Sequence, residues 1–112
     1  MKLMSWNVRG LGKPRTVGHL HQKLSDINPC IVFLIETKLS SARMAKVRKR
    51  CGYHNGIDVD AYGRSGGLSM GWKNSCMVSL RSYSARHIDI IISDDSDGFH
   101  WRCTGFYGAP EV

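Results

Sequence analysis

One acidic side chain, Glu36, stands directly after the most continuous apolar run of the sequence. That run, residues 30–35, holds six apolar residues, and its length and β-branched content predict a strand buried on both faces. In α/β sheets, ligands and catalytic groups gather at the carboxyl ends of such strands. A carboxylate at that position can bind a hard cation such as Mg²⁺ through oxygen. The alternative is an ordinary acidic residue at a strand end, and position alone favours neither.

Asn7 is the second candidate, near the end of an alternating segment, residues 2–8, that predicts a first strand. A strand–helix–strand connection would bring the ends of the two strands together, so we expect Asn7 beside Glu36. A neutral amide binds a phosphate oxygen or orients a carboxylate without adding negative charge. An isolated Asn before Val-Arg-Gly is more typical of a turn, so the pair is more informative than either residue.

The segment between those strands predicts the helix that connects them. Its apolar residues recur at spacings of three and four and therefore share one helical face: Val17, Leu20, Leu24 and Ile27. Pro14 permits the helix to start, Thr16 is a candidate cap, and Asn28-Pro29 ends the helix. The result is a strand–helix–strand unit with a right-handed crossover.

A second helix is expected to start at Ser40 or Ser41. Its pattern turns three apolar residues inward, Met44, Val47 and Cys51, and five cations outward, Arg43, Lys46, Arg48, Lys49 and Arg50. Five cations in eight residues suit non-specific contact with DNA phosphates. The alternative, a solvated helix face, is slightly favoured because phosphate contact also requires the face to border an active-site cleft.

The second half of the chain differs in composition and pattern, because glycine is frequent and there is no helical periodicity. Four short runs predict strands, at residues 67–72, 77–83, 86–92 and 99–106. The polar residues 94–98 predict a hairpin turn before the last of them. An α/β opening followed by a β-meander is typical of a layered α/β fold. Since no helix or closing element follows the last strand, we expect the domain to be incomplete.

Positive charge is concentrated in the first half of the chain. Residues 1–52 hold eleven Lys and Arg against two acids, whereas residues 53–112 hold five against seven. This balance favours a polyanionic partner, nucleic acid first, although a basic surface that binds nothing remains open. No apolar run approaches the ~18 residues that span a bilayer, and the start lacks a secretory signal. We therefore expect an intracellular protein without a membrane partner.

The four cysteines, Cys30, Cys51, Cys76 and Cys103, are scattered along the sequence. Because no C-x-x-C pair occurs, a zinc site is not expected. An intracellular chain should keep these thiols reduced. Cys30 and Cys103 lie in apolar, strand-like runs and are expected to be small core residues.

Four blocks carry a resemblance to a known family: MSWNVRGL at residues 4–11, IETK at 35–38, GRSGGL at 63–68 and TGFYGAPE at 104–111. Their order and spacing resemble the endonuclease/exonuclease/phosphatase superfamily. Their residues are most similar to those of the apurinic-type endonuclease domain of plant LINE-like, non-LTR retrotransposons. Each block alone is a weak signal, but four in order, spanning nearly the whole chain, are a strong one.

This resemblance implies the N-terminal portion of a four-layered α/β sandwich of the DNase I-like type, with residues 1–112 as one incomplete domain. It implies a phosphodiesterase that nicks DNA with Mg²⁺, or with Mn²⁺ in its place. The implied partners are DNA and the remainder of a retrotransposon polyprotein that contains a reverse transcriptase. The implied location, where the gene is expressed, is the nucleus.

The resemblance also assigns roles to individual residues. Glu36 and Asn7 match the residues that bind the metal, and with Tyr107, which matches a phosphate-contacting Tyr, they form the implied catalytic set. The residues implied to bind phosphate or DNA are Arg9, Lys38, Arg64 and Ser65. In the physical logic of such a site, the metal offsets charge on the scissile phosphate while neutral and cationic groups stabilise the transition state.

Two departures from the family pattern narrow the expected activity. Arg9 stands where cellular members often carry Asp. The family's later motifs, G-D-x-N and S-D-H, are absent from the sequence, and with them the residues that activate water. We therefore expect the chain to be impaired or inactive by itself. The alternatives are a catalytically dead remnant with at most weak non-specific nucleic-acid binding, and a phosphatase of the same superfamily acting on small phosphoesters.

Overall fold

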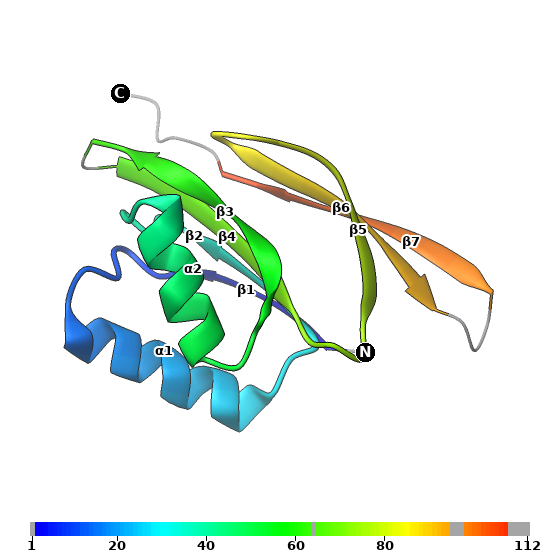
Figure 1. The fold of residues 1–112 in the computed structure, drawn as a ribbon, viewed down its shortest axis with the longest axis horizontal. Helices are drawn as coiled ribbons and strands as arrows, with labels where there is room; N and C mark the ends of the chain where they lie inside the picture. Colours follow the sequence, from blue (N-terminus) through cyan, green and yellow to red (C-terminus); the bar gives the residue numbers. More distant parts are fainter. Residues whose placement is uncertain (1, 64, 95–97, 108–112) are drawn as a thin grey trace.

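The computed structural model describes residues 2–63, 65–94 and 98–107. Over these residues the chain forms two helices and seven strands (Figure 1). In chain order they are β1 (Leu3–Asn7), α1 (Pro14–Ile27), β2 (Ile31–Ile35), α2 (Ser41–Arg50), β3 (Asn55–Tyr62), β4 (Ser65–Trp72), β5 (Met77–Ser84), β6 (His87–Asp94) and β7 (Phe99–Phe106). No helix in the described ranges has the length and apolar character needed to cross a membrane.

The first sheet has the strand order β1-β2-β4-β3. β1 and β2 are parallel and are joined through α1, which confirms the predicted strand–helix–strand unit, whereas β4 pairs antiparallel with both β2 and β3. β2 lies inside the sheet with its first four residues buried, as its apolar sequence predicted. Strand β3 was not predicted. Its Asn, Gly and Asp residues are uncommon in strands and mask the alternation of Ile57, Val59 and Ala61.

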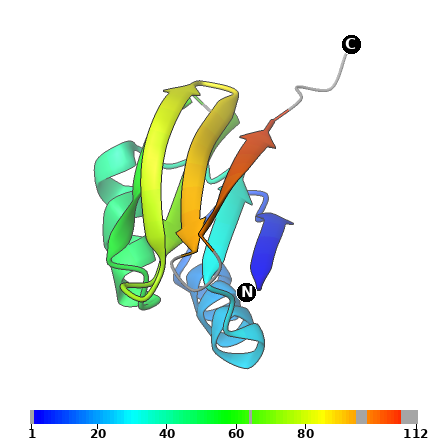
Figure 2. The same cartoon turned by 90° about the vertical axis from the view of Figure 1, so that its right-hand side faces the viewer.

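The second sheet is an antiparallel meander, β5-β6-β7, which confirms three of the four runs predicted in the second half apart from small shifts of their ends. The fourth run, residues 67–72, forms β4 and lies in the first sheet. It packs face to face on the first sheet (Figure 2). Alternate residues of β6, Ile88, Ile90 and Ile92, are buried in the core between the sheets. There Gly105 allows close approach, since a Cβ at that position would lie 2.5 Å from Phe33 Cε2.

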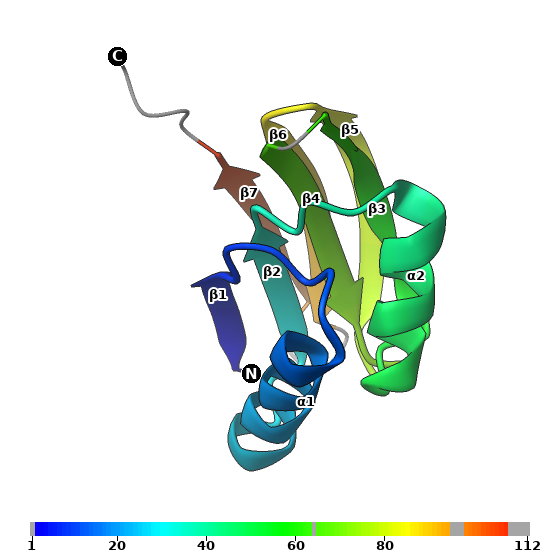
Figure 3. The same cartoon turned by 90° about the vertical axis from the view of Figure 1, so that its left-hand side faces the viewer.

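The two helices cover the other face of the first sheet (Figure 3). Leu20 and Leu24 of α1 and Met44 of α2 pack in one core with Val32 and Leu34 of β2. The described residues therefore form three layers, one of helices and two of sheet, and the predicted layered α/β fold is confirmed.

The predicted helix ends are correct except for one cap. Ser40 caps α2 by accepting a hydrogen bond from the Arg43 N–H at 3.2 Å. Thr16 does not cap α1. It lies inside the helix and donates its hydroxyl to the Lys13 carbonyl at 2.7 Å, while Lys13 occupies the N-cap position.

Arg48 was predicted to point outward with the other cations of α2, and this prediction is wrong. Its guanidinium is buried and donates to the carboxylate of Asp58 on β3 and to the Tyr53 carbonyl. Gly56 and Gly71, which are paired between β3 and β4, provide the space for this side chain. A Cβ would lie 2.8 Å from Arg48 Cδ if it were added at Gly56, and 3.0 Å if it were added at Gly71. The sequence pattern was misleading because an arginine that pairs with an acid inside the protein looks the same in the sequence as an arginine on a solvent-exposed helix face.

The expectation of four reduced thiols is also wrong for one pair. Cys30 and Cys76, which are separated by 46 positions, form a disulfide between the start of β2 and the connection from β4 to β5. Cys51 and Cys103 are free and partly buried, and burial raises the pKa of both thiols. The topology brings Cys30 and Cys76 together across neighbouring strands, which spacing along the sequence does not reveal.

Candidate functional site

The ends of β1 and β2 lie side by side at one edge of the first sheet. Asn7 is in register with Ile35, and the Val8 N–H donates to the Ile35 carbonyl at 3.0 Å. Beyond the strands the two loops stay together, because the Gly10 N–H donates to the Glu36 carbonyl at 2.7 Å. The structure therefore places Asn7 and Glu36 at neighbouring strand ends, where the sequence predicted them.

Three of the predicted site residues have a left-handed backbone. The φ angles are +51° at Arg9, +56° at Glu36 and +56° at Lys38. For residues other than glycine this conformation costs about 1–2 kcal/mol each and tends to occur at functional sites. The loop after β2 is held in this shape by β4, to which Thr37 and Lys38 donate their N–H groups, at 3.1 Å to Gly67 O and 2.9 Å to Gly66 O.

Gly67 is required for that support. Its φ is +90°, and a Cβ there would lie 2.3 Å from Thr37 Oγ1 and 3.1 Å from the Lys38 nitrogen. Thr37 itself is fully buried. Gly67 of the GRSGGL block therefore lets the backbone after Glu36 pack directly on β4.

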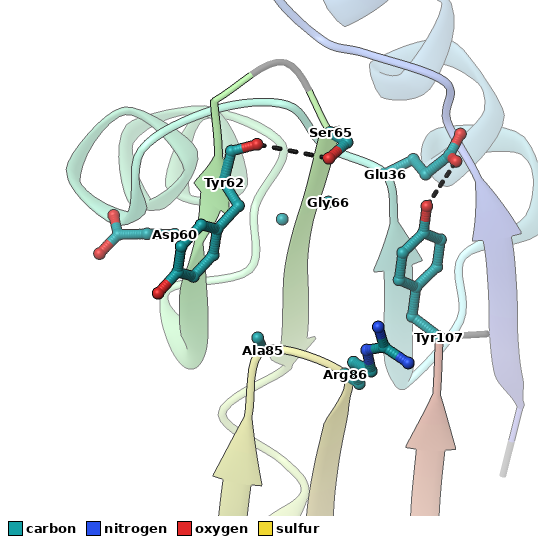
Figure 4. Close-up of a pocket in the computed structure, with 9 residues that line it drawn as sticks. Glu36, Asp60, Tyr62, Ser65, Gly66, Ala85, Arg86 and Tyr107 are labelled. Carbon is teal, nitrogen blue, oxygen red and sulfur yellow. Dashed lines mark hydrogen bonds between the residues drawn. The ribbon is translucent and has the colours of Figure 1, made fainter. Parts of the chain in front are cut away.

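Tyr107 contacts Glu36 across the two sheets. Its hydroxyl donates to Glu36 Oε1 at 2.7 Å, although the residues are 71 positions apart (Figure 4). The Tyr107 N–H donates to the Arg86 carbonyl at 2.7 Å, which fixes the residue just after β7. This hydrogen bond to Glu36 raises the pKa of Tyr107, chiefly because the carboxylate favours the protonated phenol, with desolvation acting in the same direction. Tyr107 thus remains a hydrogen-bond donor at neutral pH.

A pocket of about 490 Å³ opens beside this contact. Its charged and hydroxyl side chains come from both sheets: Glu36, Asp60, Tyr62, Ser65, Arg86 and Tyr107. Figure 4 shows Arg86 next to Tyr107, with Asp60 and Tyr62 on the side away from Glu36. The pocket combines carboxylates with a guanidinium and phenolic hydroxyls, a set suited to binding a phosphate together with a cation.

Sequence reasoning found Glu36, Ser65 and Tyr107 among the six charged or hydroxyl-bearing residues of the pocket and missed the other three. Asp60 and Tyr62 lie on strand β3, which was not predicted. They are two positions apart and therefore share one face of the strand, and this spacing was the available sequence signal. Asp60 also accepts a hydrogen bond from the Ser41 N–H at 2.6 Å, so it anchors the start of α2. Arg86 lies in the turn before β6, outside every block of the resemblance, and no sequence signal pointed to it.

The remaining predicted residues lie outside the pocket lining. Asn7 Oδ1 accepts from the Arg9 N–H at 3.1 Å and closes a turn, and both side chains are exposed. The exposed Lys38 lies along the neighbouring loop, because a Cβ at Gly10 would be 3.3 Å from Lys38 Cδ. These three residues are at the same edge as Glu36. Arg64 lies outside the described residues.

The capacity of this edge for a metal ion rests on oxygen ligands. Among residues 2–63, 65–94 and 98–107, no three His, Cys, Asp or Glu side chains are arranged to hold a metal. Glu36 offers one carboxylate and Asn7 one amide oxygen at the neighbouring strand end. Mg²⁺ commonly keeps several waters and binds through one or two carboxylates together with substrate phosphates, so this donor set fits Mg²⁺ and not a fully protein-ligated metal.

Comparison with known proteins identifies the fold. No protein-family model and no curated protein matches the sequence. The structure is similar to the crystal structure of the AP endonuclease LMAP from Leishmania major, with a TM-score of 0.70 and 22% sequence identity over 96% of this chain. The chain spans 40% of the length of that protein. The predicted DNase I-like α/β fold is therefore confirmed.

Proposed function

We propose that this chain is part of a Mg²⁺-dependent phosphodiesterase domain that nicks DNA and belongs to the endonuclease/exonuclease/phosphatase superfamily. The contact between Tyr107 and Glu36 carries the proposal. It joins a phenol and a carboxylate from opposite sheets at the mouth of a pocket, at the strand edge where α/β folds bind ligands. The similarity to an AP endonuclease supports it, as does the order of the four sequence blocks.

In this proposal Glu36 and Asn7 would hold the metal, which would offset the charge of the scissile phosphate. Tyr107 orients the Glu36 carboxylate through its hydrogen bond, and its hydroxyl is placed to donate to a phosphate oxygen. Arg86 adds a positive charge on the same rim of the pocket. Each of these groups positions the phosphate or stabilises charge.

Activation of water is the step with no assigned residue. No histidine occurs among the described residues that line the pocket, and the sequence lacks the family's S-D-H motif. We therefore propose that the 112-residue chain alone nicks DNA slowly or not at all. We further propose that this chain comes from a LINE-like retrotransposon that also encodes a reverse transcriptase, because the residues of the four blocks most resemble those elements.

The second candidate function is DNA binding without cleavage. It is favoured by the same lack of a pocket histidine together with the basic first half of the chain. In that case Glu36 and Tyr107 would be retained for folding, and the basic surface would account for the interaction with DNA.

A plasmid-nicking assay separates the two candidates. Conversion of supercoiled to open-circular DNA is measured with Mg²⁺ and with EDTA, for the wild type, Glu36→Ala and Tyr107→Phe. Asp26→Ala, which removes an exposed acid of α1, is the matched control. We expect weak nicking that Glu36→Ala abolishes and the control retains. Equal nicking by the wild type and Glu36→Ala would overturn the role of Glu36, whereas salt-dependent binding without nicking would favour the second candidate.

A further inference from the structure

A second cavity, of about 320 Å³, lies between the start of α1 and the exposed face of α2. Four cations line it, Lys13, Arg43, Lys46 and Arg50, and no acidic residue does. Its apolar wall includes Leu11 and Val47. Figure 3 shows the two elements that form it, with the loop from β1 to α1 between them. We call this cavity the basic groove.

The spacing on α2 explains why three of the cations line the same side of the groove. Arg43, Lys46 and Arg50 are three and four positions apart and therefore lie on one helical face. Arg48 lies on another face, in its buried ion pair with Asp58. None of the groove cations takes part in an ion pair formed among the described residues. Four neighbouring like charges repel one another, and an anionic ligand would relieve that repulsion.

The start of α1 adds to this positive field. Lys13 makes no side-chain capping hydrogen bond, Pro14 follows it, and the first turn of the helix has no acidic residue. The positive end of the helix dipole is thus not compensated by a side chain on α1 itself. Helix ends of this kind bind phosphate well when cationic side chains surround them.

The loop that forms one wall of the groove is hydrogen-bonded to the loop that carries Glu36. Leu11, in the groove wall, donates its N–H to the Thr37 carbonyl at 2.9 Å, and Gly10 donates to the Glu36 carbonyl. Lys38 lies along this same loop, against Gly10. A polyanion bound at the pocket would pass a cationic side chain on its way into the groove.

We infer that the basic groove binds the phosphodiester backbone of DNA beside the position that is cleaved. The inference rests on the proposed function for its choice of DNA as the polyanion. An extended strand fits better than a small anion, because the cations are spread along two elements instead of converging on one point. The contacts would be to phosphates only, so the groove would position the strand without reading its sequence.

The test measures the affinity of the 112-residue chain for a fluorescent DNA duplex of about 20 base pairs by anisotropy, in EDTA, with salt raised from about 50 to about 200 mM. The double variant Arg43→Gln/Lys46→Gln removes two groove charges. The double variant Lys23→Gln/Lys49→Gln removes two exposed charges that do not line the groove and is the matched control. Thermal unfolding of each variant verifies that it folds like the wild type.

Each lost phosphate contact should reduce the slope of log affinity against log salt by about 0.9. The groove variant should therefore lose about 1.8 from its slope and show a salt sensitivity about 12-fold smaller over this fourfold range, while the control keeps the wild-type slope. Equal slopes for the two double variants would overturn the inference. So would the absence of wild-type binding, or displacement of the DNA by millimolar inorganic phosphate.

The nicking assay keeps this result separate from the proposed function. A chain that binds DNA through the groove but does not nick plasmid supports the groove and favours DNA binding without cleavage as the function of this chain. A chain that nicks in a Glu36-dependent manner but binds equally in both double variants removes only the groove.

Discussion

Breaking the ion pair between Arg48 and Asp58 should remove a large part of the stability of this chain. The two side chains are 7% and 5% exposed, and Arg48 donates from Nε and Nη2 to the carboxylate and from Nη1 to the Tyr53 carbonyl at 2.8 Å. Arg48→Ala would leave Asp58 buried, with the Ser69 hydroxyl at 2.7 Å as its remaining donor among these contacts. Breaking a buried pair in this way costs about 3–5 kcal/mol.

That loss is measurable by urea unfolding followed by circular dichroism. Small domains have total stabilities of about 5–15 kcal/mol and urea slopes of about 1–3 kcal/mol/M. With a slope near 1.5 kcal/mol/M, Arg48→Ala should lower the unfolding midpoint by about 2–3 M, or leave the chain unfolded without urea. Lys49→Ala, on the exposed face of the same helix, is the control and should change stability by less than about 0.5 kcal/mol.

A double-mutant cycle tests the physical reason for this cost. Asp58→Asn alone leaves the Arg48 charge buried and should also be strongly destabilising. The double variant Arg48→Ala/Asp58→Asn removes both charges, so its cost should be lower than the sum of the two single costs by about 2 kcal/mol or more. Additive costs, or a cost below about 1 kcal/mol for Arg48→Ala, would refute the assignment of a buried, coupled pair.

Three further predictions concern the loop after β2, the disulfide and the tyrosine of the pocket. Gly67→Ala should cost about 2–5 kcal/mol in urea unfolding, from its positive φ and the clash with the loop, whereas Gly18→Ala in open space on α1 should stabilise by up to about 1 kcal/mol. Reduction of the disulfide between Cys30 and Cys76 should lower the free energy of unfolding by about 4 kcal/mol, given the 46-position separation, and a Cys30→Ser/Cys76→Ser variant should be insensitive to reductant. Because the folded-state pKa of Tyr107 is raised, its stabilising contribution should be complete below a tyrosine's ordinary value of about 10 and should be lost as pH rises through the folded-state value. The stability difference between wild type and Tyr107→Phe, measured by urea unfolding on both sides of that value, should therefore be constant at lower pH and shrink at alkaline pH.

The parts of the site that the sequence predicted are those fixed by one strand and its neighbour. Asn7 and Glu36 follow apolar runs that form adjacent parallel strands, so local pattern and one topological rule sufficed to place them together. Tyr107 was found through the resemblance alone, since its position beside Glu36 depends on how two whole sheets pack. Arg86 depends on the same packing but lies in no recognised block, and it was therefore missed.

The other errors of prediction came from buried charged residues, and they concerned both residues of the Arg48–Asp58 ion pair. Arg48 was interpreted as an exposed cation, and Asp58 helped to hide β3, because charged residues are rarely buried unless they are paired. A single sequence does not show that two charged residues, ten positions apart, face each other across a helix and a strand. Gly56 and Gly71 leave the space that Arg48 occupies, so they were a sequence sign of this contact. They can be interpreted in this way only when the register of β3 and β4 is known.

The structural role of Arg48 bears directly on the basic groove. A helix as rich in cations as α2 has little apolar surface with which to dock, and only Met44 and Arg48 are buried in it. The ion pair with Asp58 supplies the missing attachment and fixes the rotation of the helix, which in turn directs Arg43, Lys46 and Arg50 toward Lys13. Any partially folded Arg48→Ala protein should therefore lose the groove's share of the salt slope along with its stability. Retention of the full wild-type slope in a destabilised but folded Arg48→Ala variant would show that α2 does not need this anchor to present its cations.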